Sequence, residues 1–249
     1  MARYDFRTPR IFIDEPLAQG AAAALDRMQI NYLCNVLRLQ QGSPVLVFNG
    51  RDGEWRAELD RGGKRAAALL LRERLRAQTA PADLHYLFAP LKHARLDYMV
   101  QKAVELGASL LQPVITRHTQ VTRVNLERMQ ANAIEAAEQC GILSIAEVTQ
   151  PLPLERALAT IAAERTLVFC DEDAELADPV AALSQLRREV PMPVSVLVGP
   201  EGGFAEDERA LLLRRRNIVR LALGPRILRA DTAAIAALTL VQSVLGDWR

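Results

Sequence analysis

Several features that decide the class of a protein are scarce or absent in this chain. Its 249 residues include only three cysteines, Cys34, Cys140 and Cys170, and their wide spacing fits neither a disulfide framework nor a metal motif. The three histidines show no ligand spacing either, so no metal site is expected. No run of about 18 apolar residues could form a transmembrane helix, and the first residues lack the apolar stretch of a secretory signal. A reduced cytoplasm is therefore the expected compartment.

Charge is nearly balanced overall but unevenly distributed. The formal net charge is +1. Residues 1–79 nevertheless carry an excess of four positive charges, and the remaining residues carry an excess of three negative charges. This asymmetry is compatible with chance variation of the surface. It is equally compatible with an N-terminal part that meets a phosphate backbone.

Residues 1–75 predict a small β-rich domain. Short strands are expected at 10–13, 45–48, 54–59 and 66–75, with one helix near 21–39. The Asn49-Gly50 pair is a strong hairpin signal. Several short strands joined by close turns favour a small barrel. A polar segment that ends in proline, at 77–81, marks a change of pattern and the expected domain boundary.

The rest of the chain, residues 80–249, alternates strands with helices. The expected strands are 84–89, 110–116, 166–170, 194–198 and 218–222. The expected helices are 96–106, 126–139, 179–188, 206–216 and 232–245. This alternation predicts an α/β domain with a mostly parallel sheet.

Two glycine-containing loops follow predicted strands of that domain, where open parallel sheets bind their ligands. One loop is Gly-Pro-Glu-Gly-Gly-Phe at 199–204, and the other is Leu-Gly-Pro-Arg-Ile-Leu-Arg at 223–229. Neither is a dinucleotide fingerprint or a P-loop. Three acids at 206–208 begin the next helix and would repel phosphate. The pattern favours a cationic or zwitterionic ligand, although tight turns that only serve the fold would look the same.

The two loops belong to longer segments that are similar to the paired signatures of a known family. Segments 197–204 and 223–233, in this order and about 20 residues apart, resemble the RsmE family of the SPOUT superfamily. Its members methylate N3 of a uridine in the 16S RNA of the small ribosomal subunit. Segments 36–50, 89–107 and 135–141 also resemble the family, so the resemblance spans nearly the whole chain.

The resemblance implies a fold and a set of partners. It implies an α/β SPOUT methyltransferase domain with a C-terminal trefoil knot at 80–249. A small PUA-like β-barrel domain that binds RNA would precede it at 1–75. The implied cofactor is S-adenosyl-L-methionine (SAM), and the implied partner is 16S rRNA or the small ribosomal subunit. A homodimer with its active sites at the interface is also implied, with no metal and no membrane.

The resemblance also implies which residues form the site. Cofactor contacts, largely through backbone groups, are expected from Gly199, Glu201, Gly202, Gly203, Leu223, Gly224 and Leu228. A third loop at 171–173 is expected to contribute.

Arg226, Arg229 and Asp231 are the candidate chemical residues. The reaction must align two reactants and needs uracil N3 without its proton. Arg229 could hold a phosphate or stabilise a uridylate oxygen. Asp231 could act as the base, orient Arg229 or simply cap the following helix. The family often carries Glu at the position of Asp231 and Arg at that of Ile142, which leaves the base and one RNA contact undecided.

Two other functions compete with this interpretation. A SPOUT ribose 2′-O-methyltransferase usually has an Asn after a Ser-Leu pair at this place in the chain. Leu228-Arg229 stands there instead, which argues against this class. A non-catalytic RNA-binding protein that kept an inactive SPOUT domain is disfavoured by the intact glycines at 199, 202, 203 and 224.

Overall fold

The chain forms two compact units. The computed structural model describes residues 5–62, 66–92, 94–121, 123–174, 178–186 and 192–248. The first unit consists of Met1–Ala80 together with Ala137–Ile145. The second consists of Pro81–Ala136 and Ala146–Arg249.

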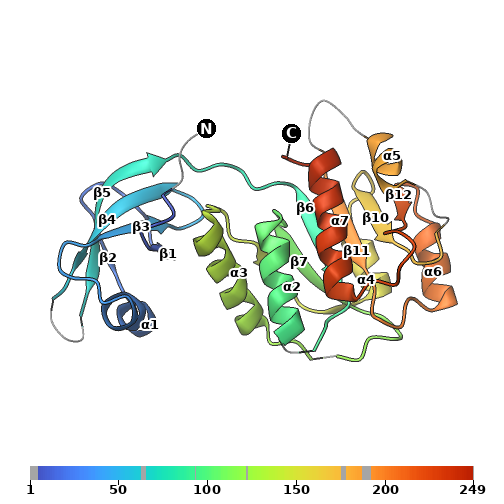
Figure 1. Cartoon of the computed structure of the whole chain (residues 1–249), viewed down its shortest axis with the longest axis horizontal. Helices are drawn as coiled ribbons and strands as arrows, with labels where there is room; N and C mark the ends of the chain where they lie inside the picture. The colour runs from blue at the N-terminus through green and yellow to red at the C-terminus, as the bar shows by residue number, and fades with distance from the viewer. Residues whose placement is uncertain are drawn as a thin grey trace. The chain divides into compact units, whose positions relative to one another are not determined.

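The first unit is built on a five-stranded sheet with the order β1-β3-β4-β5-β2 (Figure 1). Its elements are β1 (Arg10–Phe12), β2 (Ala22–Ala24), α1 (Arg27–Ile30), the π-helix η1 (Asn31–Val36), β3 (Pro44–Phe48), β4 (Glu54–Asp60) and β5 (Ala68–Arg76). The pair β1–β3 is parallel and the others are antiparallel. The edge strands β1 and β2 do not pair with each other, so the sheet forms a half-barrel.

Alternation along the strands places the core of this unit on one face of the sheet. Val45 and Val47 of β3 and Ala57 and Leu59 of β4 are buried in one cluster, as a period of two residues predicts. Leu33 of η1 is fully buried in the same cluster. The expected hairpin is confirmed, because β3 and β4 pair across the Asn49-Gly50 turn.

The predicted helix at 21–39 is wrong at both ends. Residues 22–24 form β2, which pairs with β5 through Ala23 and Leu69. Alanine is a good helix former, but pairing with a neighbouring strand overrides a weak local preference. The helix begins only after Asp26, whose side chain accepts a hydrogen bond of 2.8 Å from the Gln29 amide. The helical segment ends at Val36.

A buried ion cluster links distant parts of the first unit. Glu54 accepts hydrogen bonds from Arg10 Nε at 2.6 Å and from Arg76 Nε and Nη2 at 2.8 Å. The side chains of Arg10 and Glu54 are only 4% and 5% exposed. The two guanidinium groups also donate to the carbonyls of Glu138 and Gly141, at 3.0 and 2.9 Å. The cluster therefore fastens the 137–145 segment to the sheet of its unit.

The second unit is a three-layer α/β structure. Its strands are β6 (Leu84–Phe88), β7 (Leu110–Ile115), β8 (Glu147–Val148), β9 (Leu152–Pro153), β10 (Thr166–Cys170), β11 (Val194–Val198) and β12 (Ile218–Leu221). Its helices are α2 (Ala94–Glu105), most of α3 (Leu126–Cys140), α4 (Leu154–Thr160), α5 (Pro179–Ser184), α6 (Glu206–Leu213) and α7 (Ala230–Val244). The strand order is β12-β10-β11-β6-β7-β8, with β9 against β7. Every pairing is parallel, which confirms the predicted sheet.

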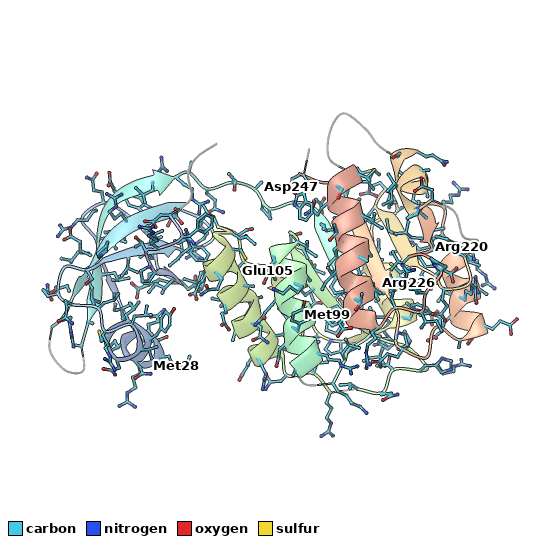
Figure 2. The ribbon with its side chains drawn as sticks, viewed as in Figure 1. Met28, Met99, Glu105, Arg220, Arg226 and Asp247 are labelled. Carbon is cyan, nitrogen blue, oxygen red and sulfur yellow. The ribbon has the colours of Figure 1, made fainter. Side chains whose placement is uncertain are left out.

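Helices cover both faces of this sheet. On one face, Leu154 and Leu158 of α4 and Leu212 of α6 join a core cluster with Leu87 and Phe169 of the strands. On the other face, α7 packs against β11 and lies beside α2, as Figure 1 shows. Met99 of α2, which Figure 2 labels, is buried, whereas the neighbouring Tyr98 is exposed.

Several boundaries differ from the sequence prediction. The last helix begins at Ala230, two residues early, and α6 ends at Leu213, three residues early. The short elements β8, β9 and α4 were not predicted. The helix α5 ends at Ser184, earlier than predicted, and the expected end at 188 lies outside the described residues. The predicted cap Asn125 is confirmed, since its side chain accepts a 3.0 Å hydrogen bond from the Arg128 amide. Within the described ranges, no helix has both the length and the apolar character needed to cross a membrane.

Candidate active site

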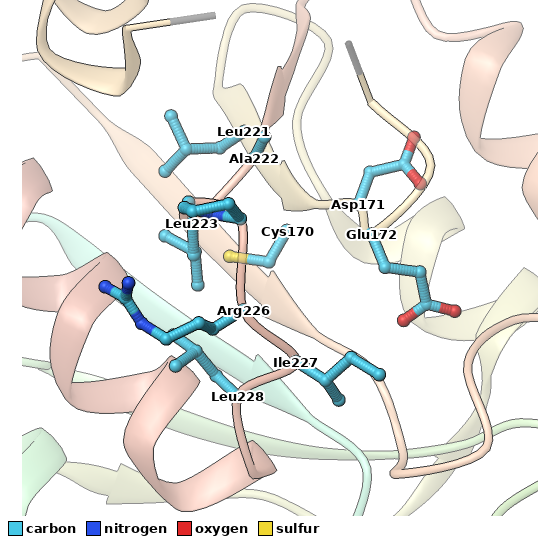
Figure 3. A pocket seen from close by; sticks show the side chains of 11 residues that line it. Cys170, Asp171, Glu172, Leu221, Ala222, Leu223, Arg226, Ile227 and Leu228 are labelled. Atoms are coloured by element: carbon cyan, nitrogen blue, oxygen red, sulfur yellow. The ribbon is translucent and has the colours of Figure 1, made fainter. Parts of the chain in front are cut away.

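The parallel sheet brings five loops to one edge of the second unit. Because all its strands run the same way, the loops after β6, β7, β10, β11 and β12 emerge at the carboxyl edge. A pocket of about 260 Å³ opens there (Figure 3). It is lined by residues 170–172 at the end of β10 and by residues 221–228 at the end of β12. The predicted residues Leu223, Gly224, Arg226 and Leu228 all line it.

The wall formed by residues 223–228 presents unpaired backbone groups. Gly224 has a φ of +96°, a conformation that L side chains rarely adopt. The backbone groups of this segment form no hydrogen bond with any described residue. Peptide N–H and C=O groups seek partners, so this wall can bind a polar ligand edge without contributing a polar side chain.

The opposite wall is acidic and firmly held. Asp171 is buried and accepts hydrogen bonds from Arg220 Nε at 2.7 Å and Arg209 Nη2 at 3.0 Å. Arg209 also pairs with Asp173. Arg220 reaches this cluster from β12 (Figure 2). These ion pairs fix the loop that carries Glu172 into the pocket.

Two titratable groups of the pocket have shifted pKa values. Burial, then the charges of Asp173 and Asp171, raise the pKa of the Glu172 carboxyl above its ordinary value. Burial, with a smaller effect of Asp171, raises the pKa of the Cys170 thiol to about 12. Cys170 lies between the two walls in Figure 3. Its thiol stays protonated at neutral pH, so it is an apolar contact and not a nucleophile.

The loop after β11 adjoins this pocket without lining it. None of Gly199, Glu201, Gly202 and Gly203 is among the lining residues. Gly203 has a φ of +67°, and a Cβ there would overlap the Glu172 carboxylate. Since β10 lies between β11 and β12, the 171–173 loop separates the two glycine loops. The structure thus brings Gly203 against the pocket wall.

A second hollow lies on the other side of the 199–204 loop. It has a volume of about 20 Å³ and is lined by Pro90, Leu91, Lys92, His118, Gln120, Val121, Pro200, Glu201 and Gly202. His118 Nδ1 lies 2.9 Å from the Gly202 carbonyl oxygen and 3.2 Å from that of Gly203. Sequence reasoning missed His118, because 84 residues separate it from the loop it contacts.

Arg229 and Asp231 lie at the start of α7. Arg229 is the N-cap residue and is exposed, with its Nη2 4.0 Å from Glu201 Oε1. The same carboxylate oxygen accepts a 3.2 Å hydrogen bond from Arg95 Nη1. Asp231 sits inside the first turn and accepts from the Thr232 amide at 2.9 Å. The alternative that Asp231 caps α7 is therefore wrong, because the helix begins one residue before it.

Metal ligation finds no support in the part of the chain that is described. There, no group of three or more His, Cys, Asp and Glu side chains is arranged to hold a metal ion.

Comparison with known proteins assigns the two parts of the chain. A model of the RNA methyltransferase domain matches residues 78–242, and a model of the RNA methyltransferase PUA domain matches residues 25–71. Ribosomal RNA small subunit methyltransferase E of Rickettsia conorii is 31% identical and aligns over 94% of each chain. Its Synechocystis counterpart is also 31% identical and aligns over 90% of this chain and 74% of its own.

Solved structures agree with the sequence relatives. Ribosomal RNA small subunit methyltransferase E of Neisseria gonorrhoeae, bound to S-adenosyl methionine, superimposes with a TM-score of 0.84 at 28% identity. The match covers 98% of this chain and all of that one. A Legionella pneumophila methyltransferase with bound SAM gives a TM-score of 0.82 at 28% identity, over 95% and 98% of the two chains. With its PUA-like half-barrel followed by a parallel α/β methyltransferase unit, the chain belongs to the ribosomal RNA small subunit methyltransferase E family of SAM-dependent RNA methyltransferases.

Proposed function

We propose that the protein transfers a methyl group from SAM to N3 of one uridine in 16S rRNA. The observation that carries this proposal is the pocket at the carboxyl edge of the sheet, with its unpaired backbone wall and its acidic wall. The relatives named for methylation of small-subunit rRNA support the choice of substrate.

The pocket suits the chemical character of SAM. Backbone groups of residues 223–228 can pair with the adenine edge. Glu172 forms no ion pair with a described residue, so its carboxylate can receive the positive charge or the hydroxyl groups of the cofactor. Gly203 would act by holding the adjoining loop against Glu172, and Gly202 by holding it against His118, with Gly199 and Glu201 in the same loop. The cofactor supplies the electrophilic methyl group.

The chain's own residues must position the uracil and manage its N3 proton. We assign Arg229 to a phosphate or a uridylate oxygen, with its guanidinium 4.0 Å from the Glu201 carboxylate that also accepts a hydrogen bond from Arg95. Asp231 is assigned either as the base that accepts the N3 proton or as the residue that orients Arg229. Arg226 lines the cofactor pocket and would act there.

Further features of the family belong to the same proposal. We expect a trefoil knot in residues 80–249 and a homodimer that completes the active sites. The α7 helix, apolar on nearly every side, is suited to an interface. We expect the unit at 1–75 to supply RNA affinity, and the cytoplasm to be the site of action.

Mapping of methylated nucleotides tests this function. Small subunits from a strain lacking the protein should contain one 16S uridine without its N3 methyl group, and the purified protein with SAM should restore it. Mass spectrometry of the nuclease fragments gives the position, and the nucleoside gives the methylated atom. A ribose-methylated product would establish the 2′-O alternative instead, and an unchanged rRNA together with SAM-independent RNA binding would establish a non-catalytic role.

A Gly224→Ala substitution should weaken SAM binding about tenfold. A side chain at a φ of +96° costs about 1–2 kcal/mol, and 1.4 kcal/mol corresponds to a factor of ten in Kd. Relaxation of the loop would misplace the backbone groups that contact the cofactor. Calorimetric titration with SAM measures the effect.

Gly42→Ala is the matched control. Gly42 has a φ of +78°, and the Cβ of an alanine would meet nothing within 4 Å, as at Gly224. It belongs to the first unit, so this variant should lose similar stability and keep its SAM affinity. Equal SAM affinities in both variants would contradict the assignment of the pocket.

A further inference from the structure

A third hollow lies on the same edge of the second unit. Its volume is about 270 Å³, and it is formed by the loop after β6, the segment before α3 and the first turns of α2 and α3. Lys92, Val121, Arg123 and Val124 are among its lining residues. We propose that this hollow binds a nucleotide of the substrate RNA next to the methylated uridine. The proposal rests on the proposed function, because it identifies where the same substrate is held.

The charges of the hollow favour an anion. Among the described residues that line it, Asp97 alone is acidic. Arg128 neutralises it by donating to both carboxylate oxygens, at 2.9 and 2.5 Å, and Asn132 donates a further hydrogen bond to it at 2.8 Å. Lys92 and Arg123 are exposed and form no ion pair with any residue that the structure describes. Two positive charges are thus left for a phosphate group.

The remaining wall favours a base. Half of the described residues that line the hollow are apolar, namely Leu91, Leu96, Val121, Val124 and Met129. Sequence-specific RNA binding proteins splay single-stranded bases into such pockets while positive side chains hold the backbone. A cavity with an apolar floor and two unpaired cations suits one nucleotide better than it suits a free anion.

The position of the hollow places that nucleotide beside the reaction. It shares Leu91, Lys92 and Val121 with the small hollow that adjoins Gly202. The neighbouring Gly203 contacts Glu172 in the wall of the cofactor pocket. The three hollows therefore follow one another along the carboxyl edge, from β12 and β10 to β6 and β7. An RNA strand on this edge would present one base to the cofactor and a neighbouring base to the 270 Å³ hollow.

The charge requirement is tested with a Lys92→Ala/Arg123→Ala double variant. Its KM for unmodified small subunits should rise about tenfold, while kcat and the Kd for SAM stay within about twofold of wild type. If each cation holds one phosphate of a single strand, the slope of log Kd against log salt for a 16S rRNA transcript should fall by about 1.4. Arg156→Ala is the matched control, since Arg156 is an exposed arginine of α4 that lines none of the three hollows.

The base requirement is tested separately with Val124→Phe, which fills the hollow without changing its charge. This variant should also raise the KM for small subunits, with the salt slope unchanged. A wild-type KM in either variant would overturn the proposal. Failure of the proposed function would give a different result, because the wild-type protein would then not methylate small subunits at all. The slope of log Kd against log salt for the transcript can still be measured in that case, since it requires no turnover.

Discussion

An Asp231→Asn enzyme is expected to turn over about 100-fold more slowly than wild type at neutral pH, the size of effect that follows loss of an acid–base group. Asparagine keeps the shape of the side chain and removes its charge. Melting temperature should barely change, because an acid in the first turn of a helix stabilises it by only about 0.3–1 kcal/mol. Single-turnover methylation of small subunits measures the rate.

Raising the pH separates the two roles of Asp231. Uridine loses its N3 proton unaided in alkaline solution, so a variant that lacks the base should recover part of its rate relative to wild type. A variant that has lost only the orientation of Arg229 should not recover. Asp207→Asn is the control, since Asp207 occupies the same second position of α6 and its ion pair with Arg117 is exposed, so the change should give a similarly small loss of stability with normal turnover. Full turnover in Asp231→Asn would remove Asp231 from the chemistry.

Replacement of Glu54 by glutamine is expected to destabilise the protein by about 3–5 kcal/mol, as for other buried ion pairs that lose one partner. The variant leaves the buried Arg10 guanidinium and that of Arg76 without their shared carboxylate. Glu58→Gln is the control from the same strand. Its partner Arg72 is half exposed, so the change should cost at most about 1 kcal/mol. Urea unfolding followed by circular dichroism measures both.

Acid should reduce the difference between wild type and Glu54→Gln. Burial alone would raise the pKa of Glu54, but hydrogen bonds from Arg76 and Arg10 lower it below its ordinary value. A lowered folded-state pKa contributes stability above the unfolded pKa of about 4.3, and that stability is lost as pH falls through the folded-state pKa. The two proteins should therefore begin to converge in stability as pH falls below the unfolded pKa, and converge fully only below the folded-state pKa. A constant difference down to pH 3 would contradict this account of Glu54.

The sequence predicted the helices and strands of the second unit better than it predicted which of its loops lie next to one another. Short apolar runs that alternate with helical segments located every long strand of the parallel sheet, and glycines marked the loops at its carboxyl edge. The order of the strands was not readable, because it depends on crossover connections and not on local pattern. For that reason the insertion of the 171–173 loop between the two glycine loops, and the contact of His118 with Gly202, were found only in the structure.

The first unit illustrates a different limit. Its hairpin follows from two turn residues that are adjacent in sequence. Its buried cluster joins Arg10, Glu54 and Arg76, which are 44 and 22 residues apart and look like ordinary surface charges in the sequence. The alanines at 21–24 favour a helix locally, but pairing with β5 decides their conformation. Both features depend on contacts between residues that are far apart in the sequence, and a short stretch of sequence does not reveal such contacts.

The shared helix α3 has a consequence for how the chain folds as it is synthesised. The helix begins in the second unit, but from Ala137 onward it belongs to the first. Arg10 and Arg76 lack the carbonyls of Glu138 and Gly141 until those residues have left the ribosome. At about 5–20 residues per second, the roughly 65 residues between Ala80 and Ile145 take about 3–13 s to make. The N-terminal sheet must wait that long for its last segment, so the unit that is translated first cannot be completed before about a third of the next one exists.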